Sequence, residues 1–144
     1  MKISSRFAVA VHILSLLAVS PTSHNTSEWI AGSVNTNPVI IRRVLGQLKK
    51  AGLVNVRSGT GGAYLIKELK DITLFEIYQA VEVVKEDQLF NLHEQPNPRC
   101  PVGANIQSVL QLVLISAQSA MEEVLMKVTM DQLVAGLIEK IGSD

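Results

Sequence analysis

The chain has 144 residues and a mass of 15.7 kDa, with 47% hydrophobic residues, 18% charged residues and one cysteine. This composition supplies the core of one compact domain, and it excludes both a disordered chain and an intramolecular disulfide framework. The net charge is zero, but it is unevenly distributed: residues 1–67 carry eight basic and one acidic side chain, and residues 68–144 carry five basic and twelve acidic ones. This asymmetry favours a basic half that binds a polyanion over a chance distribution of charge.

The N-terminal segment imitates a secretory signal, with a basic start, an apolar run and small residues. His12 and Ser15 interrupt that run, and Pro21 lies just past the would-be cleavage site. The run is also much shorter than the roughly 20 residues that span a bilayer. We therefore expect a core helix over about residues 5–19 and a soluble, cytoplasmic protein. The apolar positions have the spacing of one helical stripe: Phe7, Val11, Leu14 and Ala18.

A second helix is predicted over about residues 27–33. Asn25, with Glu28 three residues later, resembles the capping box that begins a helix. Trp29 and Ile30 give this helix an apolar side. A tight turn should follow at Val34, Asn35 and Thr36.

The third helix, over about residues 38–51, has the clearest signals. Asn37 can cap it, Pro38 falls at its first position, and Gly52 suits the left-handed conformation that follows a helix. One face is predicted to be buried: Ile41, Val44, Leu45 and Leu48. The other face points to solvent or to a partner: Val39, Arg42, Arg43 and Gln47. This pattern suits a DNA-recognition helix, although an ordinary surface helix with two solvated arginines would show it too.

A β-hairpin is predicted next, with strands over residues 53–57 and 63–66 and a glycine-rich tip between them. A phosphate-binding loop is excluded, because the Lys-Ser/Thr pair is absent and a strand follows where a helix should begin. A hairpin directly after a helix-turn-helix is a wing, whose glycines let the backbone approach a groove while Arg57 supplies a cation. A plain surface hairpin is the alternative.

A fourth helix is predicted to open at Thr73, its cap, with an apolar stripe of Leu74, Ile77, Val81 and Val84. Residues 85–103 are expected to form a loop without regular structure. This loop carries His93 and Cys100 and three prolines, namely Pro96, Pro98 and Pro101. Structureless loops of this length are uncommon in compact domains and are often functional.

A long, almost uncharged helix is predicted from about residue 105 to residue 128. It is apolar over more than one face, so we expect it to pack against two partners, its own domain and a second subunit. A monomeric core helix is the alternative, but the apolar length is large for a domain of this size. Thr129 then caps a closing helix with the apolar positions Leu133, Leu137 and Ile141.

Several segments together resemble the Rrf-type family of bacterial winged helix-turn-helix transcription regulators, which includes the IscR, NsrR and CymR regulators. The resemblance covers nearly the whole chain and rests on residues 1–4 (MKIS), 30–31 (IA), 48–54 (LKKAGLV), 59–65 (GTGGAYL), 72–74 (ITL) and 80–82 (AVE). It implies a homodimer on a palindromic operator, with the long helix as the dimer interface. The family usually has an arginine directly before the wing glycines, where this chain has Ser58, with Arg57 one place earlier.

The fold class that follows is mainly α with a small β-hairpin: a winged helix-turn-helix domain over residues 1–84, a sensor-like loop over 85–104, and a dimerisation helix with a closing helix over 105–144. Cluster-binding members of the family place three cysteines in the loop, and this chain has only Cys100. An iron–sulfur site would need His93 and an acidic residue such as Glu94 as ligands, so we expect a cluster-free member without a cofactor. Cys100, beside Arg99, is a candidate thiol sensor, with a small buried hydrophobe as the alternative.

The predicted function is a DNA-binding transcriptional regulator, expected to repress, with double-stranded DNA and a second copy as partners, no membrane and an unknown effector. Candidates for base edges are Asn37, Val39, Arg42 and Arg43. Candidates for phosphate or wing contacts are Lys2, Arg6, Lys49, Lys50, Arg57, Ser58, Gly59, Thr60, Gly61 and Gly62. Two alternatives are a cytosolic thiol-dependent enzyme, if folding brings His93 to Cys100, and a winged helix used for protein contacts.

Overall fold

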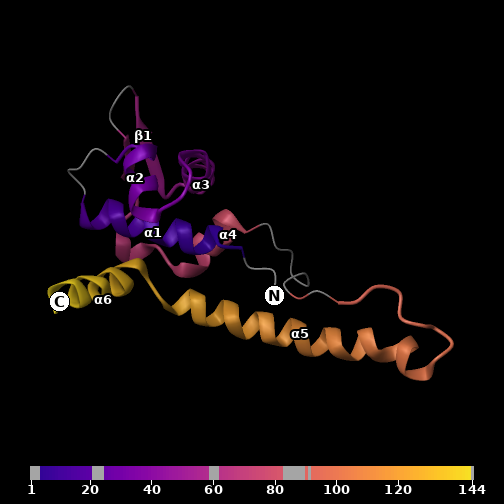
Figure 1. The fold of residues 1–144 in the computed structure, drawn as a ribbon. Coiled ribbons are helices and arrows are strands. Elements are labelled where there is room, and N and C mark those ends of the chain that lie inside the picture. Colours follow the sequence, from indigo (N-terminus) through magenta and orange to yellow (C-terminus); the bar gives the residue numbers. More distant parts are fainter. Residues whose placement is uncertain (1–3, 21–24, 59–61, 83–89, 91, 144) are drawn as a thin grey trace.

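The computed structural model describes residues 4–20, 25–58, 62–82, 90 and 92–143 (Figure 1). The described part is mainly helical with one two-stranded antiparallel sheet, so the predicted fold class is confirmed. The elements in chain order are α1 (Arg6–Val19), α2 (Ser27–Val34), α3 (Pro38–Lys50), β1 (Val54–Arg57), β2 (Gly62–Leu65), the 3₁₀ helix η1 (Leu69–Asp71), α4 (Leu74–Val81), α5 (Pro101–Lys127) and α6 (Met130–Gly142).

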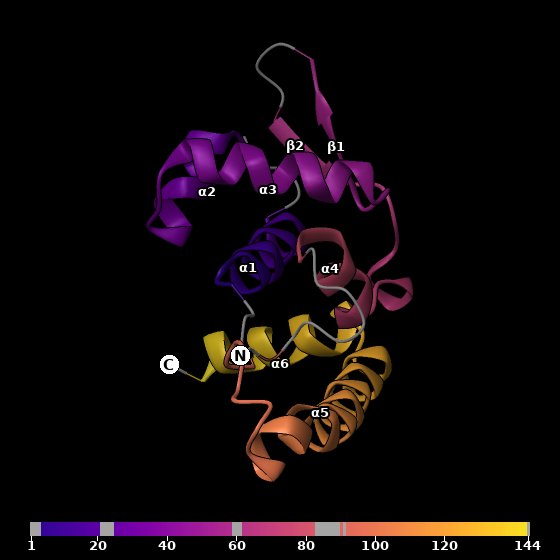
Figure 2. The ribbon, with the colours of Figure 1, turned by 90° about the vertical axis from the view of Figure 1, so that its right-hand side faces the viewer.

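One core lies between the helices of the head, by which we mean all the described elements except α5. Figure 2 shows α1 and α4 between α3 on one side and α6 on the other. The α1 side chains with no or almost no exposure are Ala10, Ile13, Leu14 and Leu17. Of the predicted stripe, Leu14 is fully buried, while Phe7, Val11 and Ala18 are partly buried and pack against the core. Burial extends beyond that stripe, because α1 contacts α2, α3, α4, β2 and α6 and is therefore covered on several sides.

The start of α2 differs from the expectation. Thr26 caps it, because its Oγ1 accepts from the Trp29 N–H at 3.2 Å. Asn25 is instead buried against the hairpin, where its Nδ2 donates to the Ala63 carbonyl at 3.4 Å and its own carbonyl accepts from the Ala63 N–H at 2.9 Å. The capping box predicted for Asn25 and Glu28 is therefore wrong, because Asn25 lies one residue too early and holds the base of the hairpin.

Helix α3 and the hairpin follow the prediction closely. Asn37 caps α3 through Oδ1, which accepts from the Val39 N–H at 2.8 Å, and Pro38 is its first residue. Gly52, just after the helix, has φ +79°, the left-handed conformation expected there. The strands pair in an antiparallel register that sets Val54 opposite Leu65 and Arg57 opposite Gly62.

Helix α4 is also capped by Thr73, as expected. Thr73 Oγ1 accepts from the Glu76 N–H at 3.1 Å at the start of α4, and Ile77 and Val81 are buried in the core. Leu74 is half-buried, and the fourth predicted stripe position, Val84, lies outside the described residues.

Helix α5 begins at Pro101, whereas residue 105 was expected. Proline at the first helical position fixes φ without losing a hydrogen bond, so the last residues assigned to the loop are the first turn of the helix. Residues 90 and 92–100 contain no helix or strand, as predicted for the loop. Figure 1 shows α5 running away from the head along most of its length.

Helix α6 returns to the head and packs on α1 and η1. Thr129 forms a capping box with Gln132, and Leu74 N–H donates to the Val128 carbonyl at 2.9 Å, which ties the start of α6 to the start of α4. Met130 and Val134 enter the core. Of the apolar positions predicted for α6, Leu133 packs half-buried against the core, whereas Leu137 and Ile141 are exposed and border a hollow that α1 also lines.

Candidate nucleic-acid interface

The outer face of α3 is open, and its inner face is fixed by the core. Ile41, Val44 and Leu48 are fully buried and Leu45 is nearly so, which anchors the helix along its whole length. Arg42, Arg43 and Val39 are exposed on the opposite side, as the spacing predicted. Gln47 departs from that prediction, since its side chain is half-buried and its Oε1 is shielded from solvent. A rigid helix with two outward arginines can present donors to the edges of bases.

The N-terminal end of α3 contributes one more candidate, Asn37. Its Oδ1 is occupied by the cap, so a base contact by Asn37 would use Nδ2, the donor of the amide. Val39, in the first turn, is 54% exposed and offers an apolar contact of the kind that a thymine methyl group takes.

Arg42 is held in place by an ion pair across the turn between the two helices. Its Nη2 donates to Glu28 Oε1 at 2.7 Å. Glu28 lies in the first turn of α2, where a carboxylate also complements the positive end of the helix dipole. The pair joins residues 14 positions apart, too far for any local sequence pattern to predict it.

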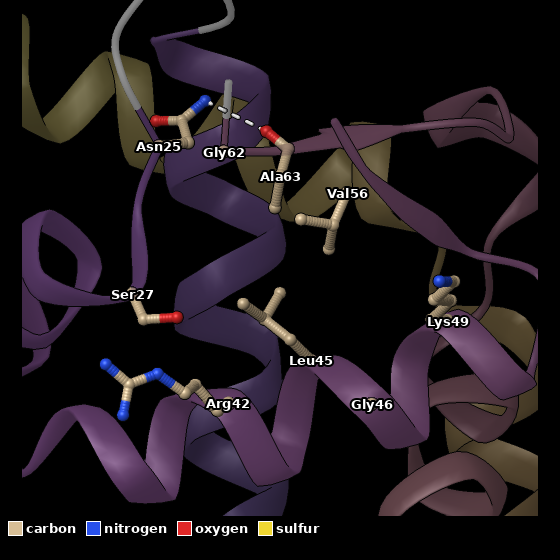
Figure 3. A pocket seen from close by; sticks show the side chains of 9 residues that line it. All are labelled: Asn25, Ser27, Arg42, Leu45, Gly46, Lys49, Val56, Gly62 and Ala63. Carbon is tan, nitrogen blue, oxygen red and sulfur yellow. Dashed lines mark hydrogen bonds between the residues drawn. The ribbon is translucent and has the colours of Figure 1, made fainter. Parts of the chain in front are cut away.

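An open cleft of ≈ 320 Å³ separates α3 from the base of the hairpin (Figure 3). Leu45 and Gly46 of α3 and Val56 and Ala63 of the hairpin form its apolar floor. Arg42 and Lys49 lie at opposite ends of the stretch of α3 that borders it, with the Arg42 guanidinium near Ser27. The charge of Arg42 is balanced by Glu28, so Lys49 is the cation that can meet a phosphate at this cleft, beside an apolar floor that suits a sugar.

The hairpin carries a further cation, Arg57, which does not line this cleft but borders a second one together with Tyr64 and Leu65. The Arg57 guanidinium lies over the Tyr64 ring, 4.9 Å from its centroid, so a cation–π contact across the two strands orients it. Ser58 is exposed next to it. Of the predicted wing glycines, Gly62 is described, with φ +78°, and a Cβ there would lie 2.6 Å from the Asn25 carbonyl, so only glycine fits. Gly59, Thr60 and Gly61 lie outside the described residues.

The remaining phosphate candidates lie on two helices. Lys49 and Lys50 are exposed in the last turn of α3, where cations also complement the negative end of the helix dipole. Arg6, in the first turn of α1, donates from Nε to Ser4 Oγ at 3.2 Å. Lys2 lies outside the described residues.

Glu82 is a residue whose role the sequence did not reveal. The carboxylate is buried at the end of α4, and its Oε1 accepts from Ser4 N–H at 3.1 Å and from Ser4 Oγ at 2.7 Å. Burial, followed by the negative charges of Glu122 and Glu82, raises the pKa of the neighbouring Tyr78. Ser4 and Glu82 belong to two of the segments that carry the family resemblance, which was the only signal for this contact.

Cys100 lies at the opposite end of α5 from the head. It is exposed, contrary to the buried alternative, and occupies the N-cap position of α5. The backbone N–H groups of Gly103 and Val102 stabilise the thiolate, which lowers the pKa of Cys100. The described residues contain no group of three His, Cys, Asp or Glu side chains that could hold a metal ion, and the one cysteine per chain does not fit a thiolate-bound cluster.

Comparisons with known proteins agree with this geometry. The family model described as "Rrf2: Iron-dependent Transcriptional regulator" matches residues 3–136. YwnA of Bacillus subtilis (strain 168), described as an HTH-type transcriptional regulator, is 51% identical over 120 residues, which cover 83% of this chain and 87% of YwnA.

Two solved structures are also similar. A Lactobacillus plantarum protein described as a transcriptional regulator superposes with a TM-score of 0.79 at 26% identity, over 99% of this chain and 100% of that one. IscR of T. potens superposes with a TM-score of 0.69 at 23% identity, over 95% of this chain and 88% of that one, and shares the fold.

Proposed function

The chain belongs to the Rrf2 family of transcriptional regulators, and from that premise we propose that it binds a palindromic operator as a homodimer and represses the adjacent gene. The family resemblance drawn from the sequence is thereby confirmed, and the chain is a DNA-binding regulator rather than an enzyme. The family model is described as iron-dependent, but the described residues and the single cysteine do not fit an iron–sulfur cluster, so no step through iron is proposed.

The observation that carries the proposal is the open outer face of α3 beside the wing. Arg43, Arg42, Val39 and the Asn37 amide would contact base edges in a major groove, where arginine prefers the O6 and N7 of guanine. Lys49, Lys50, Arg6 and Lys2 would contact phosphates, which set affinity without choosing sequence. Arg57, Ser58 and the segment from Gly59 to Gly62 would follow the backbone into the next groove.

The test is binding to the DNA upstream of the protein's own gene, compared with a random duplex of the same length. Tight binding that prefers the upstream DNA, and weakens steeply as salt rises, is the expected result. Equal binding to both duplexes would remove sequence recognition, and no binding would favour the alternative in which the winged helix contacts proteins.

Homodimerisation is supported by the exposure of α5. Of its described side chains only Gln118 is buried, whereas Leu112 is 73% exposed and Val113 and Val124 are each 61% exposed. Apolar surface of this extent on a soluble protein marks a contact site. A helix of 27 residues is about 40 Å long, enough for a second copy to pack along it.

A membrane is the competing explanation for α5, which is the one described helix long and apolar enough to span a bilayer. That length is weak evidence, because an exposed dimer helix has the same composition. Glu122, Glu123 and Lys127 lie in its last turns, and α6 folds directly back onto the head. We place the protein in the cytoplasm, and a dimer in the soluble fraction by light scattering would support that placement.

We also propose that Cys100 makes the regulator responsive to oxidants. Its position at the start of α5 exposes the sulfur and stabilises the thiolate, which is the reactive form. Attack of that thiolate on hydrogen peroxide forms an S–O bond and breaks the O–O bond, giving a sulfenic acid and a hydroxide ion. Operator affinity of the Cys100→Ser protein should not respond to peroxide, and a response equal to that of the wild type would refute the thiol mechanism.

A further inference from the structure

Glu28 is the only acidic residue among residues 1–67, and it pairs with one of the two arginines on the outer face of α3. The Arg42 side chain is 56% exposed and that of Glu28 is 66% exposed. Ion pairs at this exposure contribute little to folding. We therefore expect the pair to affect DNA binding rather than folding stability.

The charge of Glu28 opposes the function of the face on which it lies. Arg43, Lys49 and Lys50 are exposed on α3, and DNA that approaches them brings a row of negative phosphates past the Glu28 carboxylate. The other ion pairs of the described residues, Lys67–Glu76 and Lys70–Glu68, lie outside α2 and α3, in the segment around η1 and α4. A carboxylate on the DNA side thus lowers the affinity for any duplex, unless its bond to Arg42 helps that arginine to contact a base.

We propose that Glu28 is a specificity-determining residue that acts through Arg42, an inference that rests on the proposed function. The pair is neutral as a whole, so it gains little from a phosphate, which offers charge but no sequence. The guanidinium has five N–H donors in a fixed fork, and the bond from Nη2 to Glu28 orients the fork while other N–H groups still point outward. A guanine at the matching position accepts two of them through O6 and N7.

Specificity in this arrangement comes from weakening the wrong complexes as well as from strengthening the right one. On random DNA the Glu28 charge repels the backbone and Arg42 stays neutralised. On the operator the oriented Arg42 recovers that loss by base contact. Glu28 therefore lowers the affinity for all DNA but lowers it least for the operator.

The test compares the wild-type protein with Glu28→Gln, which keeps the size of the side chain and removes its charge. The operator is the duplex that the wild type selects from a random pool, and the reference is an unselected duplex of the same length. Glu28→Gln should bind the reference at least about threefold more tightly, with a salt slope steeper by about one phosphate. Its preference for the operator over the reference should fall at least about threefold.

Two further variants separate the proposal from a general charge effect. Glu68→Gln removes a carboxylate of similar exposure from the residue just before η1. It should leave the preference for the operator over the reference duplex unchanged. In an Arg42→Gln background, Glu28→Gln should no longer change the preference, because the route through Arg42 is gone.

An equal gain on both duplexes for Glu28→Gln, or an undiminished effect in the Arg42→Gln background, would overturn the inference. If instead the wild type selects no sequence from the pool, the proposed function itself fails, and that result is distinguishable from either of the others.

Discussion

The winged head and helix α5 handle apolar side chains in opposite ways. The head encloses an apolar core, in which Ile13, Ile41 and Leu48 have no exposure, and it presents cations on α3 and the hairpin. Helix α5 is also rich in apolar residues but buries only Gln118. The head can therefore fold around its own core, whereas α5 has a surface that one chain leaves uncovered. This difference supports the proposed division of the chain, in which the head binds DNA and α5 forms the contact with a second copy.

The largest effect should come from the head's core, at Ile41. Its replacement by alanine leaves a cavity at a fully buried position and should lower the free energy of unfolding by about 2–5 kcal/mol, measured by chemical denaturation. Ile40, the adjacent residue on the same helix, is 39% exposed, so Ile40→Ala should cost less than about 1 kcal/mol. Equal losses for the two variants would show that α3 is not anchored by its inner face.

In helix α5, charged substitutions on the exposed apolar surface should weaken dimerisation. Leu112→Glu with Val113→Glu places two carboxylates in the proposed dimer contact and should weaken dimerisation about 100-fold or more, which is about 3 kcal/mol, in sedimentation equilibrium. The described head offers a matched control in Ile66, which is 50% exposed, and Ile66→Glu should leave the dimer intact. A dimer that survives the double substitution would mean that α5 does not form the interface.

The two arginines and two lysines of α3 should separate recognition from general affinity. Arg43→Ala should cost about 1–3 kcal/mol on the operator and relax its sequence preference, because a bidentate base contact is lost. Lys49→Ala should weaken operator and random DNA alike and reduce the salt slope by about one phosphate. Fluorescence anisotropy titrations at several salt concentrations measure both. If Arg43→Ala weakened both duplexes equally, Arg43 would belong with the phosphate contacts.

The head was largely predictable from the sequence because its signals are local. The cap at Asn37, the proline after it and the apolar spacing from Ile41 to Leu48 lie within a few turns of one helix and specified both its start and its buried face. The hairpin was predictable for the same reason, since its strands are separated by a short glycine-rich tip.

The errors arose where distant segments decide. Helix α1 is covered on several sides, so periodicity alone did not identify its buried residues. Asn25 is buried by Ala63, which lies 38 positions away, and this contact removed it from the predicted cap. Likewise, nothing local to Glu28 reveals that it meets Arg42 on the next helix. The residue patterns already favoured a DNA-binding helix and a second subunit, and the family resemblance added the palindromic operator and the role of the long helix as dimer interface.

The smallest effect expected is a shift in the reactivity of Cys100 at the far end of α5. The head has no comparable group, because Cys100 is the only cysteine of the chain. The lowered pKa of Cys100 means that the thiolate persists to lower pH in the folded chain than in the unfolded one. The rate of alkylation by iodoacetamide should therefore rise with pH and level off at a lower pH for the native protein than for the same protein in denaturant. Identical midpoints would show that the N–H groups of Val102 and Gly103 do not stabilise the thiolate, and the thiol mechanism would lose its structural basis.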